Sequence, residues 1–238
     1  MKILGIDSSG MVASAAIVTD NVTTAEYSVN FKKTHSETLL PMVDEILTMT
    51  DTHLDELDAI ALAVGPGSFT GLRIGAATVK GLAMAAEKPV VPVPTLDALA
   101  YNLWGTDKLV CPIMDARRNQ VYTGIYSFEN GVLRAHTEQL ALDIAELAEQ
   151  LNALGRPVIF TGDGCPVFEE QLKTLMKTEF SFAPAQMNRQ RAAAVAALGA
   201  IYYAEGRSEN ADEMKPVYLR KSQAEREREE GKGTYYES

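Results

Sequence analysis

Apolar residues fall into short strand-like runs at the start of the chain. The first run, residues 2–7, ends in Asp7, and polar residues separate it from further runs at 12–19 and 25–31. Runs of this length, rich in Val, Ile and Ala and bounded by turn residues, are typical of β-strands. The pattern therefore predicts three antiparallel strands joined by turns.

Helical spacing then alternates with buried strands. Apolar residues recur every three or four positions across 36–50, 70–86 and 95–104, which predicts three helices. Continuous apolar runs at 57–64 and 89–93 predict buried strands between these helices. Such alternation is typical of parallel strands connected by helices.

The order of elements restarts in the second half. Residues 109–115 again form an apolar strand that ends in an acid, and a returning strand is expected at 121–128 before a turn at 129–131. The remaining elements expected are a strand at 157–161 and helices at 142–153, 166–177 and 190–205. The expected architecture is therefore two packed copies of one α/β unit with a cleft between them.

Composition and charge restrict the function classes. The chain has 238 residues, and 22 Lys and Arg against 32 Asp and Glu give a formal net charge of −10. That sign argues against nucleic-acid binding by the chain alone, because such binding depends on cations that neutralise phosphates. The sequence shows neither an apolar run long enough to span a bilayer nor the apolar core of a signal peptide. We therefore expect a cytoplasmic protein without membrane contact.

Cysteines and histidines are few and do not follow metal-ligand spacing. Cys111 and Cys165 lie far apart, and Cys111 stands in an apolar run, which favours a buried structural thiol in a reducing compartment. No two of the three histidines are three to five residues apart, so neither HxxxH nor HExxH is present. The sequence therefore predicts no metal site.

The strongest local signal is the glycine-rich segment GPGSFTGLRIG, which begins at Gly65 and ends at Gly75. It follows a buried strand and opens a helix that Ser68 or Thr70 can cap, and the free amides of a helix start suit an anion. The segment is not a P-loop, because no Gly-Lys-Ser/Thr follows. A tight turn and close helix packing also explain the glycines, and we favour this interpretation over phosphate binding.

A second candidate site combines the acids at the ends of the two opening strands. Asp7 is followed by Ser8, and Asp115 stands at the matching point of the second half, before Arg117 and Arg118. In actin-like kinases and ATPases, an acid and hydroxyls in the first hairpin handle phosphate and magnesium. Each aspartate can instead order its own turn, and this is the favoured interpretation for either one alone. The two arginines suit an anion or an acidic partner better than a metal.

The turn after the strand at 157–161 is a third candidate. Gly162 and Gly164 flank an aspartate there, and this turn would suit contact with an adenosine. A sharp left-handed turn explains the two glycines equally well.

Two helices are apolar on more than one face. The predicted helices at 36–50 and 70–86 carry more apolar positions than one sheet can cover. We expect the second face to contact a partner's helices rather than a helix of the same chain. The residues expected at this interface are Leu39, Met42, Val43, Ile46, Ile74, Thr78 and Leu82.

Several motifs together resemble the TsaB family, also called YeaZ-type proteins. They are ILGIDSS, THSETLLP, GPGSFTGLRIG, DARRNQVY, the GDG turn and PVYLRKSQAE, and they run from residue 3 to about 224 in the family's order. The resemblance implies a duplicated actin-like (ASKHA, ribonuclease H-like) α/β fold whose two lobes each hold a mixed five-stranded sheet and helices. Residues 1–104 would form the N-terminal lobe with the partner interface, and 105–220 the C-terminal lobe, whose last helix packs back on the first. Residues 221–238 would be a charged flexible tail.

The resemblance also implies a role without catalysis. TsaB proteins pair with TsaD, which carries an HxxxH metal motif and the active site, and with the ATPase TsaE, for threonylcarbamoyl transfer to the adenosine next to the tRNA anticodon. Through the same helices the chain is expected to form a homodimer when alone, and to meet tRNA only through the complex. No cofactor is expected in the chain itself, although a nucleotide at the complex interface stays open.

Two other functions remain open from the residues themselves. The first is an actin-like nucleotide-binding ATPase or phosphotransferase, supported by Asp7, Asp115 and the glycine-rich turns. The second is a glycoprotease-like metallopeptidase, which the missing histidine pair disfavours.

Overall fold

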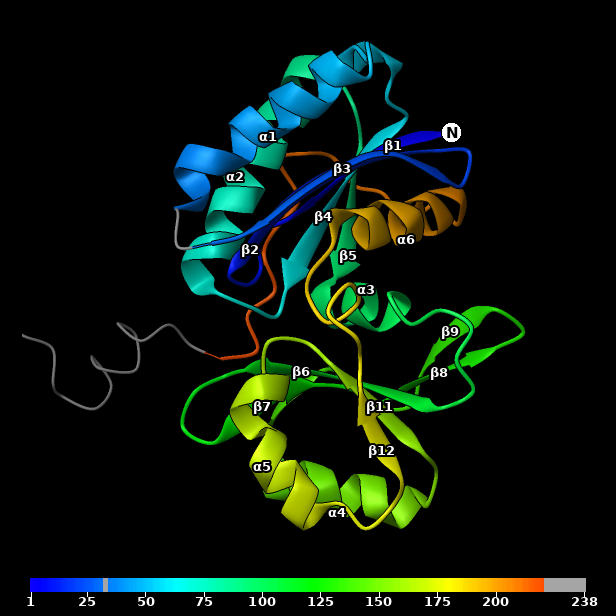
Figure 1. Cartoon of the computed structure of the whole chain (residues 1–238). Coiled ribbons are helices and arrows are strands. Elements are labelled where there is room, and N and C mark those ends of the chain that lie inside the picture. Colours follow the sequence, from blue (N-terminus) through cyan, green and yellow to red (C-terminus); the bar gives the residue numbers. More distant parts are fainter. Residues whose placement is uncertain (32–33, 221–238) are drawn as a thin grey trace, which may run out of the picture.

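The computed structural model describes residues 1–31 and 34–220, in two lobes built on separate β-sheets (Figure 1). The tail expected at 221–238 lies outside the described residues. The first sheet has the order β3-β2-β1-β4-β5. Its strands are β1 (Lys2–Asp7), β2 (Val12–Thr19), β3 (Val22–Asn30), β4 (Ala59–Gly65) and β5 (Val90–Pro94).

The pairing within this sheet follows the sequence pattern. β1, β2 and β3 are antiparallel neighbours, whereas β4 runs parallel to both β1 and β5. Every residue of β4 is buried, as expected for a parallel strand with both faces covered. β3 is the exposed edge, and its residues are largely open to solvent.

Helices cover both faces of the first sheet. α1 (His35–Met49) and α2 (Phe69–Ala86) lie side by side on one face, with a short 3-10 turn, η1 (Leu54–Glu56), after α1 (Figure 1). α6 (Ala192–Ala204) packs against β1, β2 and β4 on the other face. It approaches closely because Gly5 of β1 has no side chain, and a Cβ at this position would meet the backbone carbonyl of Ala192.

The second sheet contains seven strands, where five were expected. Five of them follow the order β10-β7-β6-β11-β12, and β8 and β9 form a hairpin beside β6. The strands are β6 (Leu109–Asp115), β7 (Gln120–Thr123), β8 (Tyr126–Glu129), β9 (Val132–Ala135), β10 (Leu140–Asp143), β11 (Val158–Thr161) and β12 (Phe180–Phe182). α4 (Ile144–Leu154) and α5 (Cys165–Leu175) pack together with this sheet in one apolar core.

The extra strands arise at Gly124. The strand expected at 121–128 breaks there into β7 and β8, and β8 leaves β7 to pair with β9. Asn130 and Gly131 join β8 to β9 with φ angles of 51° and 78°, the positive values that a tight Asn-Gly hairpin turn requires. The sequence correctly marked this turn, but it did not show that one long strand would divide between two pairings.

α3 (Thr95–Tyr101) connects the two lobes. Its apolar residues pack with Val110, Met114 and Tyr126 of the second lobe. Its Asp97 carboxylate accepts hydrogen bonds from the Tyr126 hydroxyl at 2.9 Å, the Gln139 amide at 2.8 Å and the Tyr202 hydroxyl at 3.0 Å. Because Tyr202 belongs to α6, one carboxylate ties together α3, α6 and the second lobe.

No helix among the residues that the structure describes is both long enough and apolar enough to cross a membrane.

Candidate functional site

The loop after β1 lines the space between the lobes with Ser9, Gly10 and Met11. Asp7 ends β1 and is buried, and its Oδ1 accepts hydrogen bonds from the Ser9 amide at 2.8 Å and the Ser9 hydroxyl at 2.6 Å. Within the described residues its Oδ2 has no partner. Burial raises the pKa of this carboxyl to about 6, although the Ser9 hydrogen bonds oppose the shift.

The glycine-rich turn packs directly on this loop. Ser68 donates its backbone amide to the Ser9 carbonyl at 2.7 Å, and its side chain caps α2 by accepting from the Gly71 amide at 3.3 Å. A Cβ at Gly67 or Gly71 would run into the carbonyl of Ser9 or Ser8. These glycines therefore allow the start of α2 to touch the β1–β2 loop, which supports the packing interpretation of the motif.

A second set of unpartnered polar atoms surrounds the same loop. His35, the first residue of α1, contacts the Gly10 carbonyl through Nε2 at 2.8 Å, and its Nδ1 has no partner in the described chain. Gln190 is 2% exposed, lies against Gly10, and neither end of its amide has a partner among the described residues. Sequence reasoning missed Gln190, because nothing local to it distinguishes it from a surface glutamine.

The matching loop of the second lobe carries Asp115 and the two arginines. Asp115 Oδ1 accepts from the Arg117 amide at 2.8 Å, and its Oδ2 pairs with the Arg117 guanidinium at 3.1 Å. Arg118 is exposed beside it. The carboxylate therefore orders its own turn and is already matched by a cation.

The GDG turn approaches the β6 backbone. Gly164 donates its amide to the Ile113 carbonyl at 2.9 Å, and Gly162 has a φ of 107°. A side chain on Gly162 would meet the same carbonyl, so both glycines are explained by this contact. Asp163 between them has an unpartnered Oδ1 within the described chain, and burial raises the pKa of this carboxyl while Arg189 lowers it.

These loops enclose a cleft of about 500 Å³ between the lobes. Ser68, Asp115 and Arg117 line it, whereas Ser8, Gly162 and Gly164 are not among the lining residues and Thr70 is exposed on α2. One wall is the segment 217–220, which no sequence argument placed there. That segment is held by a hydrogen bond from the Val217 amide to the Val64 carbonyl at 2.7 Å and by one from Arg220 to the Ala116 carbonyl at 2.7 Å.

The residues of the cleft do not fit a resident magnesium–nucleotide. Mg²⁺ prefers several oxygen ligands held in near-octahedral geometry. Asp115 is paired with Arg117, Asp7 is only 1% exposed, and burial raises the pKa of both Asp7 and Asp163. Across the described residues no group of three or more His, Cys, Asp or Glu side chains is placed to hold a metal.

The cysteines also offer no nucleophile. Both are free and buried in the second lobe, and burial raises the pKa of each thiol to about 12. Because the thiolate is the reactive form, both thiols are structural.

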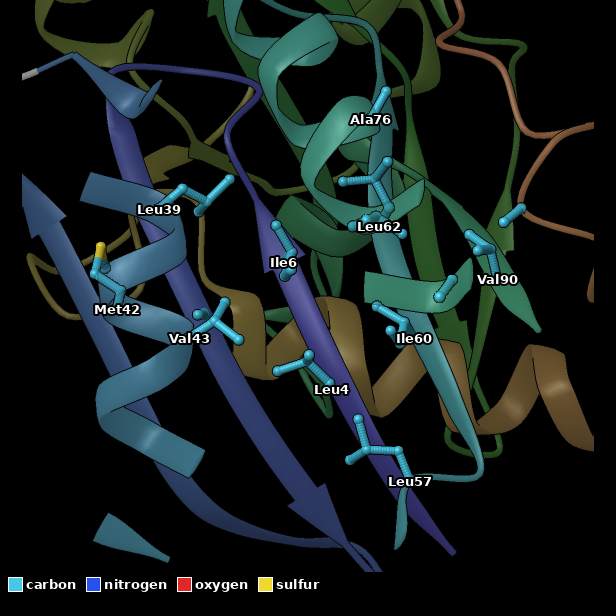
Figure 2. Close-up of a cluster of buried hydrophobic side chains, with 14 of the residues drawn as sticks. Leu4, Ile6, Leu39, Met42, Val43, Leu57, Ile60, Leu62, Ala76 and Val90 are labelled. Atoms are coloured by element: carbon cyan, nitrogen blue, oxygen red, sulfur yellow. The ribbon is translucent and has the colours of Figure 1, made fainter. Parts of the chain in front are cut away.

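The structure revises the expected partner interface. Leu39, Met42, Val43 and Ile46 are at most 4% exposed and belong to the core of their own lobe. Figure 2 shows Leu39 and Val43 directed toward β1. Only Ile74, Thr78 and Leu82 of the expected set are half-buried on α2.

Other apolar residues are exposed on the same two helices. Leu40 and Met49 of α1 are 53% and 74% exposed, and Met84 of α2 is 67% exposed. Half-buried Leu47, Ile74 and Leu82 lie in the same two helices and pack on the lobe core. We call these six residues the α1–α2 face. An open groove of about 770 Å³ lies between α1 and β3, and Met42 is among the residues that line it.

A pH-dependent stability follows from Asp7. Its folded-state pKa of about 6 exceeds the usual 3.8, so the folded chain holds the proton more tightly than the unfolded chain. Its contribution to stability is therefore present below about pH 4 and is lost as pH rises through about 6, by about 3 kcal/mol for a shift of this size. Asp7→Asn removes this dependence and keeps the oxygen that accepts from Ser9.

Denaturant unfolding of the wild type and Asp7→Asn at several pH values measures this effect. We expect Asp7→Asn to gain about 2–3 kcal/mol relative to the wild type between about pH 4 and pH 7. Asp44→Asn, an exposed change on α1, should follow the wild-type profile. Parallel profiles for Asp7→Asn and the wild type would show that Asp7 ionises normally.

Two sheets of related strand order, each opening with a strand that ends in an acid beside the shared cleft, define an actin-like two-lobed protein of the ASKHA class. An inorganic polyphosphate/ATP-glucomannokinase from Arthrobacter sp. strain KM shares this fold, with a TM-score of 0.51 at 14% identity over 86% of this chain and 99% of that one. The chain belongs to the TsaB family. It is 34% identical to the tRNA threonylcarbamoyladenosine biosynthesis protein TsaB of Bacillus subtilis (strain 168), over 94% of this chain and 96% of that protein.

Two further comparisons agree with this assignment. The family model described as TsaD, tRNA N6-adenosine threonylcarbamoyltransferase, matches residues 28–228. The structure of YeaZ from Pseudomonas aeruginosa superposes with a TM-score of 0.79 at 29% identity, covering 92% of this chain and 99% of that chain. The family and fold expected from the motifs are thereby confirmed.

Proposed function

We propose that this chain is a non-catalytic subunit that pairs with a TsaD-like catalytic subunit, and with a TsaE-like ATPase, for threonylcarbamoyl transfer to the adenosine next to the tRNA anticodon. Its relatives are named for tRNA threonylcarbamoyladenosine biosynthesis, which supports a role for this chain in that process. This process implies that the chain acts in the cytoplasm. The same surface is proposed to form a homodimer when the partner is missing.

The observation that carries the proposal is the α1–α2 face. Three large apolar side chains, Leu40, Met49 and Met84, stand on two adjacent helices that are otherwise packed on their own sheet. Exposed apolar side chains on two adjacent helices favour a protein partner. The groove between α1 and β3 is a separate recess beside α1 that suits complementary packing.

Features of the cleft support a role without catalysis. Asp115 is paired with Arg117, burial raises the pKa of both cysteine thiols, and the chain has no HxxxH pair. A general acid or base also needs access to a reacting group, whereas Asp7 is 1% exposed. The chemistry is therefore assigned to the partner.

Titration calorimetry of the chain with a TsaD-like subunit tests the proposal. We expect saturable binding at equal stoichiometry, and no hydrolysis of ATP or modification of tRNA by the chain alone. Sedimentation of the chain alone should show a concentration-dependent dimer, and addition of the TsaD-like subunit should dissociate it. A chain that modifies tRNA alone, or that ignores the TsaD-like subunit, would contradict the proposed role.

A further inference from the structure

Arginines gather at the mouth of the cleft in a chain of net charge −10. Arg117 and Arg220 line the cleft, and Arg118 is exposed beside Arg117. Arg73 of α2 is joined to the same place, because its Nε donates to the hydroxyl of Tyr218, which also lines the cleft, at 3.4 Å. All four are arginines rather than lysines, and the planar guanidinium is suited to two-pronged contact with a phosphate.

The turn that carries two of these arginines has an uncommon backbone. The backbone φ angles of Arg117, Arg118 and Asn119 are 64°, 58° and 60°. These are left-handed values that residues other than glycine rarely adopt. We call residues 117–119 the arginine turn. A short left-handed turn without glycine persists only where the surrounding structure enforces it, and such sites are often functional.

The surrounding structure does enforce the arginine turn. The Ala116 amide donates to the Gln120 carbonyl at 2.9 Å, which closes the turn at its base. The Asn119 side chain donates to the Asp143 carboxylate at 3.1 Å, and Arg220 donates to the Ala116 carbonyl. One hydrogen bond at its base and contacts with two distant segments, at Asp143 and Arg220, therefore hold the turn in place.

The arginine turn carries positive charge that the other described residues do not fully neutralise. The Arg117 side chain is 86% exposed even though it pairs with Asp115. Arg118 makes no hydrogen bond or ion pair with any other described residue. An exposed pair with a carboxylate is weak, so a phosphate can replace or join it at little cost.

Aromatic faces lie next to these cations. The rings of Phe69 and Tyr218 are 4.7 Å apart between centroids, and the Arg73 guanidinium lies 4.0 Å above the Phe69 ring. Phe69, Tyr122 and Tyr218 all line the cleft. Arginines interleaved with partly exposed aromatic rings are typical of surfaces that bind unpaired nucleotides, whose bases stack while phosphates meet guanidinium groups. An acidic protein partner would require only the cations.

We propose that the arginine turn, with Arg220 and the Phe69–Tyr218 pair, contacts an unpaired segment of the RNA substrate and binds its phosphates. This inference rests on the proposed function and deepens it, because the subunit then binds the RNA as well as its partner. The acidic remainder of the chain weakens this contact for the chain alone at physiological salt, so it operates within the complex.

Fluorescence anisotropy with a labelled anticodon stem-loop RNA tests the proposal in the complex with the TsaD-like subunit. Each phosphate contact to a single strand contributes about 0.7 to the slope of log K against log salt. The double change Arg117→Gln with Arg118→Gln should therefore lower the slope by about 1.4 and weaken binding about 15-fold near 0.15 M salt. Arg118→Lys should keep the slope.

A matched control separates the site from general charge. Arg134→Gln removes an exposed arginine from β9, in the same lobe but outside the residues that line the cleft. It should leave the affinity and the slope unchanged. Ultraviolet cross-linking of an iodouridine-substituted loop should place RNA on the peptide that contains Tyr218, and the double change should reduce that yield.

Three outcomes would overturn the proposal. One is an unchanged affinity and slope in the double variant while pairing and tRNA modification persist, which leaves the proposed function intact. Another is loss of pairing with the TsaD-like subunit, which makes the arginines a protein contact. The third is arginine-dependent binding of free ATP without any effect on RNA. If the chain does not pair at all, the same slope comparison is made on the chain alone at low salt, and an unchanged slope again refutes the contact.

Discussion

Leu40→Glu combined with Met84→Glu is expected to abolish pairing with the TsaD-like subunit while leaving the chain folded. Both side chains are more than half exposed, so the free energy of unfolding of the chain alone should change by only about 0.5 kcal/mol. In a packed interface, a buried unpaired charge costs about 2–5 kcal/mol. The dissociation constant should therefore rise at least about 30-fold.

Calorimetry and sedimentation measure this effect, with Val132→Glu as the control. Val132 is an exposed apolar residue of β9 in the second lobe, away from α1 and α2. Its change should leave both the heterodimer and the homodimer intact. Equal affinities for all three proteins would place the partner elsewhere. Val43→Glu and Ile46→Glu are unsuitable tests, because both residues are buried and the variants would unfold the lobe.

Gly5→Ala is expected to destabilise the chain by about 3 kcal/mol, the upper end of the usual overpacking cost. The new methyl group would meet the backbone carbonyl of Ala192 and the side chain of Ala196, and a helix backbone cannot yield as a side chain can. α6 would have to move away from β1. Thermal or denaturant unfolding measures the loss.

Gly81→Ala is the matched control for this change. Gly81 lies inside α2, and a Cβ there would have no atom within 4 Å. Because glycine is unfavourable inside a helix, this variant should be more stable by about 0.5–1 kcal/mol. If both glycine variants behaved alike, the close packing of α6 on β1 would not be a main support of the fold.

Much of the fold could be predicted from periodicity and turn residues. The helix predicted at 70–86 is α2, which begins at Phe69 after Ser68, one of its two expected caps, and β1, β2 and β6 have the predicted bounds. These features depend on local chemistry alone. The division of one expected strand into β7 and β8 at Gly124 was not predictable, because it depends on which strand pairs with β9.

The candidate sites were less predictable for a geometric reason. On α1 the most apolar positions, such as Leu39 and Val43, face the sheet, and the partner-facing set is decided by where the sheet lies. The cleft is assembled from segments far apart in the chain, with Gly10 against Gln190 and Gly65 against Val217. No local pattern at Gln190 or Val217 reports these contacts.

The measurement that tests the central claim most directly is reconstituted tRNA modification with three versions of this chain. The reaction contains tRNA, the threonylcarbamoyl donor, the TsaD-like and TsaE-like subunits and ATP. If the chain acts through its α1–α2 face, the wild type and a cleft variant with Asp7→Asn and Asp163→Asn support modification, whereas Leu40→Glu with Met84→Glu does not. If the cleft variant abolishes modification while still pairing, and the face variant supports it, the cleft is catalytic and the subunit role proposed here is wrong.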